Sequence, residues 1–140
     1  MQKTFGIHHL SAMIDNAQNN IDFYENILGL RLVKKTVNFD DPSTYHLYFG
    51  NYAGNPGTLL TFFPNENYNK GIIGDGQVGV IHLIIPIGSM AYWNKRLNDY
   101  NIETKFNYRF NEKYLSFKDV HGLNIEFVER EVDDRTINSF

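Results

Sequence analysis

Two neighbouring histidines near the start of the chain, His8 and His9, are the first residues that could do chemistry. They lie in a run of apolar and β-branched residues, 5–13, which is typical of a β-strand. Successive strand side chains point to opposite faces, so the two imidazoles cannot face the same way without a bulge. One of them therefore lies on the face away from the helix that follows. A later strand-like stretch, 78–86, has its own central histidine, His82.

A carboxylate occurs in the last strand-like stretch, 123–129. The apolar residues of this stretch alternate and suit a face covered by a helix, so Glu126 is expected on the opposite face. An ionised glutamate there is costly unless it is paired or bound to a cation. Together, His9, His82 and Glu126 would form two imidazoles and one carboxylate. Such a set holds Fe(II), Mn(II) or Zn(II) and leaves positions open for a substrate.

Each of these residues also has a purely structural alternative. His82 could bond a backbone carbonyl, and Glu126 could pair with one of three cations: Lys105, Lys113 or Arg109. Four aromatic side chains could flank a planar ligand or could belong to the core: Tyr45, Tyr48, Phe62 and Phe63.

The elements that would position these residues occur twice in the same order. In the first unit, a strand at 5–13 precedes a helix from Asp15 to Leu28, and further strands are expected at 30–39, 44–49 and 58–63. In the second unit, a strand at 78–86 precedes a helix at 90–100 that Ser89 can cap, and strands follow at 103–110, 113–118 and 123–129. The offset between the units is about 70 residues.

The repeat predicts module 1 at about 1–64, a polar linker at 65–77, module 2 at about 78–130 and a tail at 131–140. It also pairs positions between the modules, with His9 in the place of His82 and Thr61 in the place of Glu126. On this alignment the first module offers a histidine without a carboxylate. We therefore expect at most one metal site for each pair of modules.

The predicted fold class is α+β, with two βαβββ modules that form curved mixed sheets with helices outside. One helix covers only one face of a four-stranded sheet, so the other face must be buried by a partner or must line a cavity. Two such modules would make a cup, and the candidate ligands would point into it.

Composition narrows the function classes. The 140 residues are 42% hydrophobic and 15% aromatic, and their formal charge of −3 gives no electrostatic reason to expect nucleic acid, which would need a clustered basic face. No apolar run approaches the roughly 20 residues that span a bilayer, and the N-terminus has no signal-peptide pattern. Cysteine is absent, which excludes disulfides and thiolate chemistry. We expect a cytoplasmic protein with no membrane or nucleic-acid partner.

Several stretches, loops included, resemble a known family over nearly the whole chain. They are Gly6-Ile-His-His-Leu, Phe23-Tyr-Glu-Asn-Ile-Leu-Gly-Leu-Arg-Leu-Val-Lys-Lys-Thr-Val-Asn-Phe-Asp-Asp-Pro, Thr44-Tyr-His-Leu-Tyr-Phe-Gly and Pro56-Gly-Thr-Leu-Leu-Thr-Phe-Phe-Pro. The sequence resembles the vicinal oxygen chelate superfamily, which includes glyoxalases, fosfomycin and bleomycin resistance proteins and extradiol dioxygenases. Within it, the hydroquinone-type ring-cleaving dioxygenases are most similar.

The resemblance implies paired βαβββ modules around a divalent metal, usually Fe(II) or Mn(II). His9 matches a metal ligand, and His82 and Glu126 match the family's His–Glu pattern. His8 matches a residue that assists substrate or oxygen chemistry, and Arg109 matches an arginine near the bound oxygen and substrate. These roles make His8 and Arg109 the candidate catalytic residues.

The resemblance also implies pocket residues. Ser11 lies where a small hydroxyl residue is usual. The family has a tyrosine ten residues before the ligand glutamate, where this chain has Ser116, while Tyr114 has the same strand parity. Family members carry four modules and this chain carries two. Single-domain relatives often pair modules across two chains, so we predict a homodimer with His9 from one subunit and the other two ligands from its partner.

The resulting hypothesis is a metal-dependent, extradiol-type dioxygenase that degrades a small hydroquinone or catechol. One alternative is a glyoxalase-like or thiol-transferase-like metalloenzyme, for which Thr61 is a poor substitute for the expected carboxylate. Another is a non-catalytic binding protein of the bleomycin-resistance type. The sequence leaves open whether the two-module chain is active alone.

Overall fold

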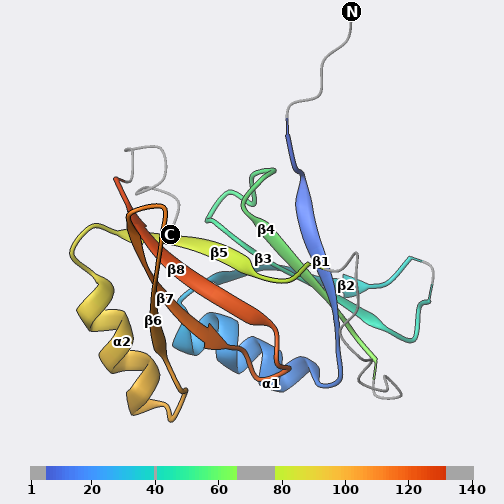
Figure 1. The fold of residues 1–140 in the computed structure, drawn as a ribbon. Helices are drawn as coiled ribbons and strands as arrows, with labels where there is room; N and C mark the ends of the chain where they lie inside the picture. Colours follow the sequence, from blue (N-terminus) through green and yellow to red (C-terminus); the bar gives the residue numbers. More distant parts are fainter. Residues whose placement is uncertain (1–5, 40, 66–77, 132–140) are drawn as a thin grey trace, which may run out of the picture. The chain divides into compact units, whose positions relative to one another are not determined.

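The computed structural model describes residues 6–39, 41–65 and 78–131. The predicted linker at 65–77 and the tail at 131–140 lie almost entirely outside these residues. The chain divides into two compact units, one with strands β1–β4 and one with β5–β8 (Figure 1).

The first unit is one mixed sheet with a helix. Its elements are β1 (His9–Ile14), α1 (Ala17–Ile21), η1 (Asp22–Ile27), β2 (Arg31–Val37), β3 (Tyr45–Gly50) and β4 (Leu59–Pro64). The strand order is β1-β4-β3-β2, with β1 parallel to β4 and the other pairs antiparallel.

The second unit repeats this topology. Its elements are β5 (Ile81–Pro86), α2 (Met90–Asp99), β6 (Lys105–Arg109), β7 (Glu112–Lys118) and β8 (Asn124–Arg130). The strand order is β5-β8-β7-β6, with β5 parallel to β8. The predicted α+β class with two βαβββ modules is confirmed.

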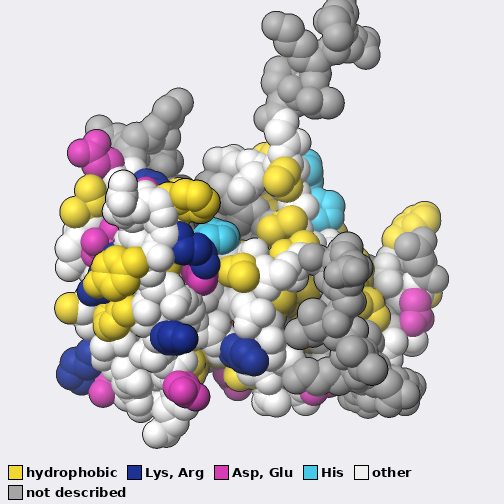
Figure 2. All heavy atoms as spheres, in the orientation of Figure 1, with side chains coloured by type: hydrophobic (Ala, Val, Ile, Leu, Met, Phe, Trp, Pro, Cys, Tyr) yellow, Lys and Arg dark blue, Asp and Glu magenta, His cyan; other side chains and the backbone are white. Residues whose placement is uncertain are grey.

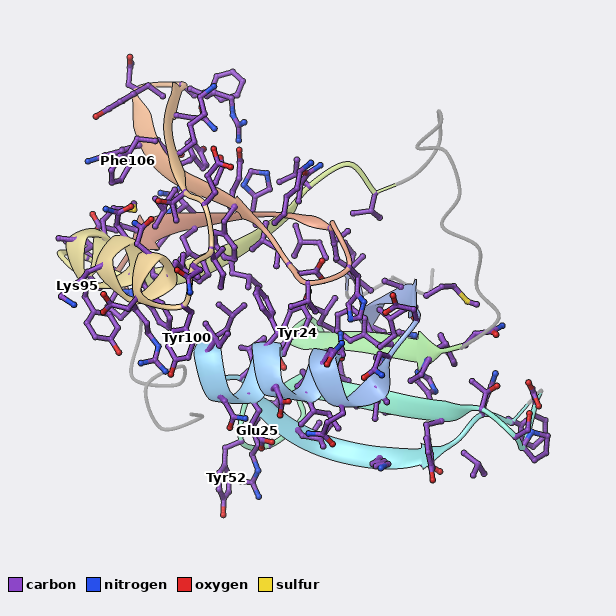
Figure 3. The ribbon with its side chains drawn as sticks, turned by 90° about the horizontal axis from the view of Figure 1, so that it is seen from below. Tyr24, Glu25, Tyr52, Lys95, Tyr100 and Phe106 are labelled. Carbon is purple, nitrogen blue, oxygen red and sulfur yellow. The ribbon has the colours of Figure 1, made fainter. Side chains whose placement is uncertain are left out.

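In the first unit, the helix packs on one face of the sheet through aromatic rings. Tyr24, labelled in Figure 3, is fully buried, and its ring centroid lies 5.4 Å from that of Phe49 and 4.7 Å from that of Phe62. Burial of each such side chain contributes about 1.5–3 kcal/mol. Alternation then places Thr61 and Phe63 on the other face of β4, which we call the helix-free face.

The second unit has the matching arrangement. The ring centroid of Trp93 on α2 lies 5.0 Å from that of Phe127 on β8, while Lys95 on α2 and Tyr100, the residue that follows this helix, are exposed (Figure 3). Because Phe127 faces the helix, its neighbour Glu126 faces the helix-free side of this sheet. The predicted orientation of Glu126 is therefore correct.

The helix ends differ from the sequence prediction. Asn16, and not Asp15, is the N-cap of α1, and its Oδ1 accepts a 2.9 Å hydrogen bond from the backbone N–H of Asn19. Ser89 does not cap α2 with its side chain, because its Oγ donates to the carbonyl of Pro86. The free N–H of Met90 is satisfied instead by Glu129 Oε1 at 2.9 Å. A carboxylate from β8 thus caps this helix.

Within the described residues, neither helix is long and apolar enough to cross a membrane.

Candidate metal centre

An imidazole and a carboxylate lie side by side on the helix-free face of the second unit. His82 on β5 is directly opposite Glu126 on β8, and His82 Nδ1 lies 3.6 Å from Glu126 Oε2. The two side chains differ in exposure, 47% for His82 and 6% for Glu126. Two ligands of one ion with bonds of about 2.1 Å at a right angle are separated by about 3.0 Å, so small side-chain shifts suffice for a shared metal. In chemistry and spacing, the pair fits a divalent cation.

Glu126 already has other partners. Both terminal nitrogens of the Arg109 guanidinium donate to its carboxylate, Nη1 to Oε1 at 3.0 Å and Nη2 to Oε2. Ser116 Oγ donates to Oε1 at 2.8 Å and receives a hydrogen bond from Asn107 Nδ2. Burial alone raises the pKa of the Glu126 carboxyl, but the hydrogen bonds from Arg109 and Ser116 and the charges of Arg109 and His82 together leave this pKa below its usual range. The alternative that Glu126 pairs with Arg109 is thus observed.

A second arginine–carboxylate pair lies beside the first. Arg130 Nη2 is 2.6 Å from Glu112 Oε1, and Tyr114 OH donates to Glu112 Oε2 at 2.7 Å. The guanidinium of Arg109 lies over the ring of Tyr114, with Cζ 4.5 Å from its centroid. The His82 ring meets the same tyrosine edge to face at 5.7 Å. Tyr114 therefore connects the two pairs, on the strand where the sequence comparison expected a site tyrosine.

In the first unit, two hydroxyls occupy the corresponding place. Ser11 on β1 is directly opposite Thr61 on β4, and their oxygens are 2.7 Å apart. Phe62 and Phe127 contact the helices of their units alike, which makes Thr61 the counterpart of Glu126 as predicted. The register then makes Ser11 the counterpart of His82.

The spacing to the helices instead pairs His9 with His82, because each lies seven residues before the N-cap of the helix that follows, Asn16 and Ser89. The equivalence of His9 with His82 therefore stays a prediction. His9 is opposite Leu59 and lies two residues before Ser11 on the same face, about 6.6 Å along the strand. The strand register and the helix spacing thus differ by two residues along β1.

His9 has a polar partner in its predecessor. His8 Nδ1 and His9 Nδ1 are 2.9 Å apart, with the rings nearly perpendicular, and both side chains are exposed. One Nδ1 must donate and the other accept. If His9 donates, its Nε2 lone pair is free to bind a metal, and His8 acts as the outer partner that metal-bound histidines usually have.

His46 lies near His9 and shares the helix-free face with Ser11 and Thr61. The sequence analysis did not identify this residue. Its ring stacks on Phe63 at 3.9 Å between centroids, and Tyr48 OH lies 2.8 Å from its Nδ1. Burial lowers the pKa of His46, and the nearby charges of His9 and Lys34 lower it further. The alternation around Tyr48 could have revealed that His46 shares its face.

The four candidate pocket aromatics divide between the faces. Tyr48 and Phe63 lie on the helix-free face with His46. Phe62 is fully buried against Tyr24, so it belongs to the core and not to a pocket. Tyr45 is 48% exposed at the start of β3 and lies under Lys35, with Nζ 4.3 Å from its ring centroid.

Among the described residues, no three histidine or acidic side chains form a cluster that could hold a metal. The second unit by itself supplies His82 and Glu126. Figure 2 shows a histidine, basic side chains and an acidic side chain gathered on the unit that carries β5–β8.

The topology and the polar helix-free faces define a protein of the paired βαβββ class. A family profile described as "Glyoxalase/Bleomycin resistance protein/Dioxygenase superfamily" matches residues 6–127. The chain belongs to this superfamily, whose members generally bind a divalent metal and act on small molecules.

Several relatives of this chain carry the names of ring-cleaving dioxygenases. The chain is 57% identical over 130 residues to "Putative ring-cleaving dioxygenase MhqO" of Bacillus subtilis, covering 93% of this chain and 42% of the relative. It is 36% identical to the chlorohydroquinone/hydroquinone 1,2-dioxygenase of Sphingobium indicum, over 94% of this chain and 42% of the relative. A crystal structure of a "putative dioxygenase" from B. subtilis has 54% identity and a TM-score of 0.91, covering 100% of this chain and 45% of that one. The chain thus spans less than half the length of these relatives.

Proposed function

We propose that this protein takes part in metal-dependent, extradiol-type cleavage of a hydroquinone or catechol ring. The observation that carries the proposal is the pairing of His82 with Glu126 on the helix-free face. The similarity to ring-cleaving dioxygenases supports the choice of reaction and substrate class.

In this proposal, His82 and Glu126 supply two ligands and His9 supplies the third. Fe(II) or Mn(II) suits such a set best, and Zn(II) binds similar ligands. The bound ion would act as a Lewis acid that lowers the pKa of a ring hydroxyl and, as Fe(II), would provide a redox path between the ring and O₂. Both oxygen atoms then enter the product, so no separate reductant is required.

The remaining residues would bind the substrate and move protons. Arg109 carries a guanidinium that can stabilise an oxyanion on the ring. His8 Nδ1 is hydrogen-bonded to His9, so His8 can orient that imidazole, and its Nε2–H could donate to a developing oxyanion. Tyr48, Phe63 and Tyr114 have rings on the helix-free faces that could flank a planar substrate, with Ser11 and Ser116 as polar neighbours.

We further propose that the ligand set is completed in a homodimer, with His9 from one subunit and the other two ligands from its partner. Each unit has one helix and leaves one sheet face without a helix of its own, which favours closure by a second unit. A strictly monomeric species by light scattering at micromolar concentration would contradict this arrangement. A cytoplasmic location remains part of the proposal.

The direct test is oxygen uptake with hydroquinone after reconstitution with Fe(II). Wild type is expected to consume O₂, and His82→Ala is expected to lose the activity because one of the ligands is missing. Tyr52→Phe is a suitable control, since Tyr52 lies in the β3–β4 connection, where its ring contacts Arg31. Equal uptake by wild type and His82→Ala would remove His82 from the mechanism.

The second candidate is a binding protein that uses no metal. It is favoured by the contacts of Glu126, whose two oxygens already accept hydrogen bonds from Arg109 and Ser116. It predicts no bound transition metal in elemental analysis of the purified protein and unchanged ligand binding in Glu126→Ala. A stoichiometric metal content would rule it out.

A further inference from the structure

The contacts of Glu126 place a cation where a metal ion would have to bind. Oε2, the oxygen that faces His82 Nδ1 at 3.6 Å, is the oxygen to which Arg109 Nη2 donates. Oε1 accepts from Arg109 Nη1 and from Ser116. A divalent ion held by His82 and Glu126 would approach Oε2 and would meet the guanidinium at close range. Two cations cannot share that oxygen without strong repulsion.

The two partners of this ion pair differ in their freedom to move. Glu126 lies on β8 between β5 and β7, and its side chain is 6% exposed. Arg109 is the last residue of the edge strand β6, and its side chain is 41% exposed. Glu126 is therefore held by its sheet, while Arg109 can turn toward solvent at little cost.

We propose that Arg109 and a divalent cation are alternative occupants of Glu126, so that metal loading displaces the guanidinium from the carboxylate. This inference rests on the proposed metal site and adds a regulatory role for one of its residues. Without metal, Arg109 compensates a buried carboxylate that would otherwise be costly. With metal, Arg109 is released and becomes available to a substrate anion.

The ring of Tyr114 can hold the released guanidinium through a cation–π contact. Arg109 Cζ already lies 4.5 Å from its centroid, and a cation can remain there when the carboxylate is lost as a partner. Tyr114 is itself fixed by its hydrogen bond to Glu112. The anion-binding group would thus become available next to the metal only after the metal has bound.

The same sheet provides a matched control. Arg130 pairs with Glu112 at 2.6 Å, with a side-chain exposure of 43% that is close to the 41% of Arg109. Arg130→Met removes one arginine from this face and leaves the contacts of Glu126 in place. It therefore separates occupancy of Glu126 from the general effect of losing a positive charge.

The experiment is calorimetric titration of Mn(II) into the 140-residue chain stripped with a chelator, without substrate. Arg109→Met is expected to bind Mn(II) at least about tenfold more tightly than wild type, because no charge-assisted hydrogen bonds to Glu126 must be broken. Its metal-free melting temperature should fall, because the buried carboxylate loses its partner. Arg130→Met should keep the wild-type affinity within about twofold. Glu126→Gln should lose the binding in every background.

Arg109→Lys keeps the charge and removes the bidentate fork, and it guards against misfolding of the methionine variant. We expect its affinity to lie between those of wild type and Arg109→Met. Equal or weaker binding by both Arg109 variants, in a wild type that binds Mn(II), would overturn the displacement and leave the proposed metal site intact. Binding only after Arg109 is replaced would support it. No binding by any of these proteins would refute the metal site itself, and the inference with it.

Discussion

Ser11 faces Thr61 across strands β1 and β4, with their hydroxyl oxygens 2.7 Å apart. The same register in the second unit holds His82 and Glu126. The repeat therefore keeps a polar pair at one position on both helix-free faces, but the residue types differ. A hydroxyl pair is a poor ligand set for a divalent ion, whereas an imidazole and a carboxylate are a good one. This asymmetry supports one metal site for each pair of units.

The contact between His8 and His9 leads to a prediction about metal affinity. His8→Phe removes the acceptor that can hold His9 in the tautomer with a free Nε2, and we expect Mn(II) affinity to fall by about 10–100-fold. His8→Asn, whose Oδ1 can still accept, should retain more of the affinity. Calorimetric titration with Mn(II) measures both. Wild-type affinity in His8→Phe would show that His8 does not orient a metal ligand.

The capping of α2 by Glu129 predicts an effect on stability. Glu129→Ala leaves the backbone N–H of Met90 without its partner, so the free energy of unfolding should fall by about 1 kcal/mol. Ser89→Ala removes only the hydrogen bond that the half-buried Ser89 donates to the carbonyl of Pro86, so the free energy of unfolding should fall by less. Urea denaturation followed by circular dichroism compares the two variants. A larger loss in Ser89→Ala would contradict the assignment of the cap.

The lowered pKa of His46 predicts a pH dependence of stability. The unfolded chain takes up a proton near the ordinary value of about 6.5, whereas the folded protein resists it because the ring is partly buried and lies near His9 and Lys34. As the pH falls below about 6.5, the unfolded state is therefore favoured and stability is lost until the folded-state pKa is reached. Above this range, His46 is neutral in both states and has no such effect.

His46→Phe removes this titration, so its stability should fall less steeply than that of wild type between about pH 7.5 and 5. Chemical denaturation at several pH values gives the two slopes. Val37→Thr, at an exposed position of β2, is a control that leaves the slope unchanged. Parallel curves for wild type and His46→Phe would refute the prediction.

The sequence predicted the element order and the facing of the key side chains, because both follow from local alternation. Ile125 and Phe127 are apolar, so Glu126 had to face the other side. Alternation gives a face but no position along the strand, so the sequence could not show that the register places Ser11, two residues after His9, opposite Thr61.

Contacts between residues that are far apart in the sequence could not be predicted from it either. The cap that Glu129 provides to Met90 spans 39 residues, and nothing near Ser89 indicates it. Lys105, Lys113 and Arg109 were equally plausible partners for Glu126. The strand register places Lys105 level with Glu126, through Ser116, and only the side-chain contacts identify Arg109 as the partner. Phe62 and Phe63 are adjacent and chemically alike, so packing against Tyr24 was needed to assign one to the core.

The central claim is that His9, His82 and Glu126 bind one divalent ion, and the most direct measurement is anomalous diffraction from crystals grown with Mn(II). We predict a single anomalous peak about 2.0–2.3 Å from an imidazole nitrogen of each histidine and from an oxygen of Glu126, with Arg109 turned away from the carboxylate. An ordered Glu126 still paired with Arg109 at saturating Mn(II), with no peak beside His82, would contradict the account.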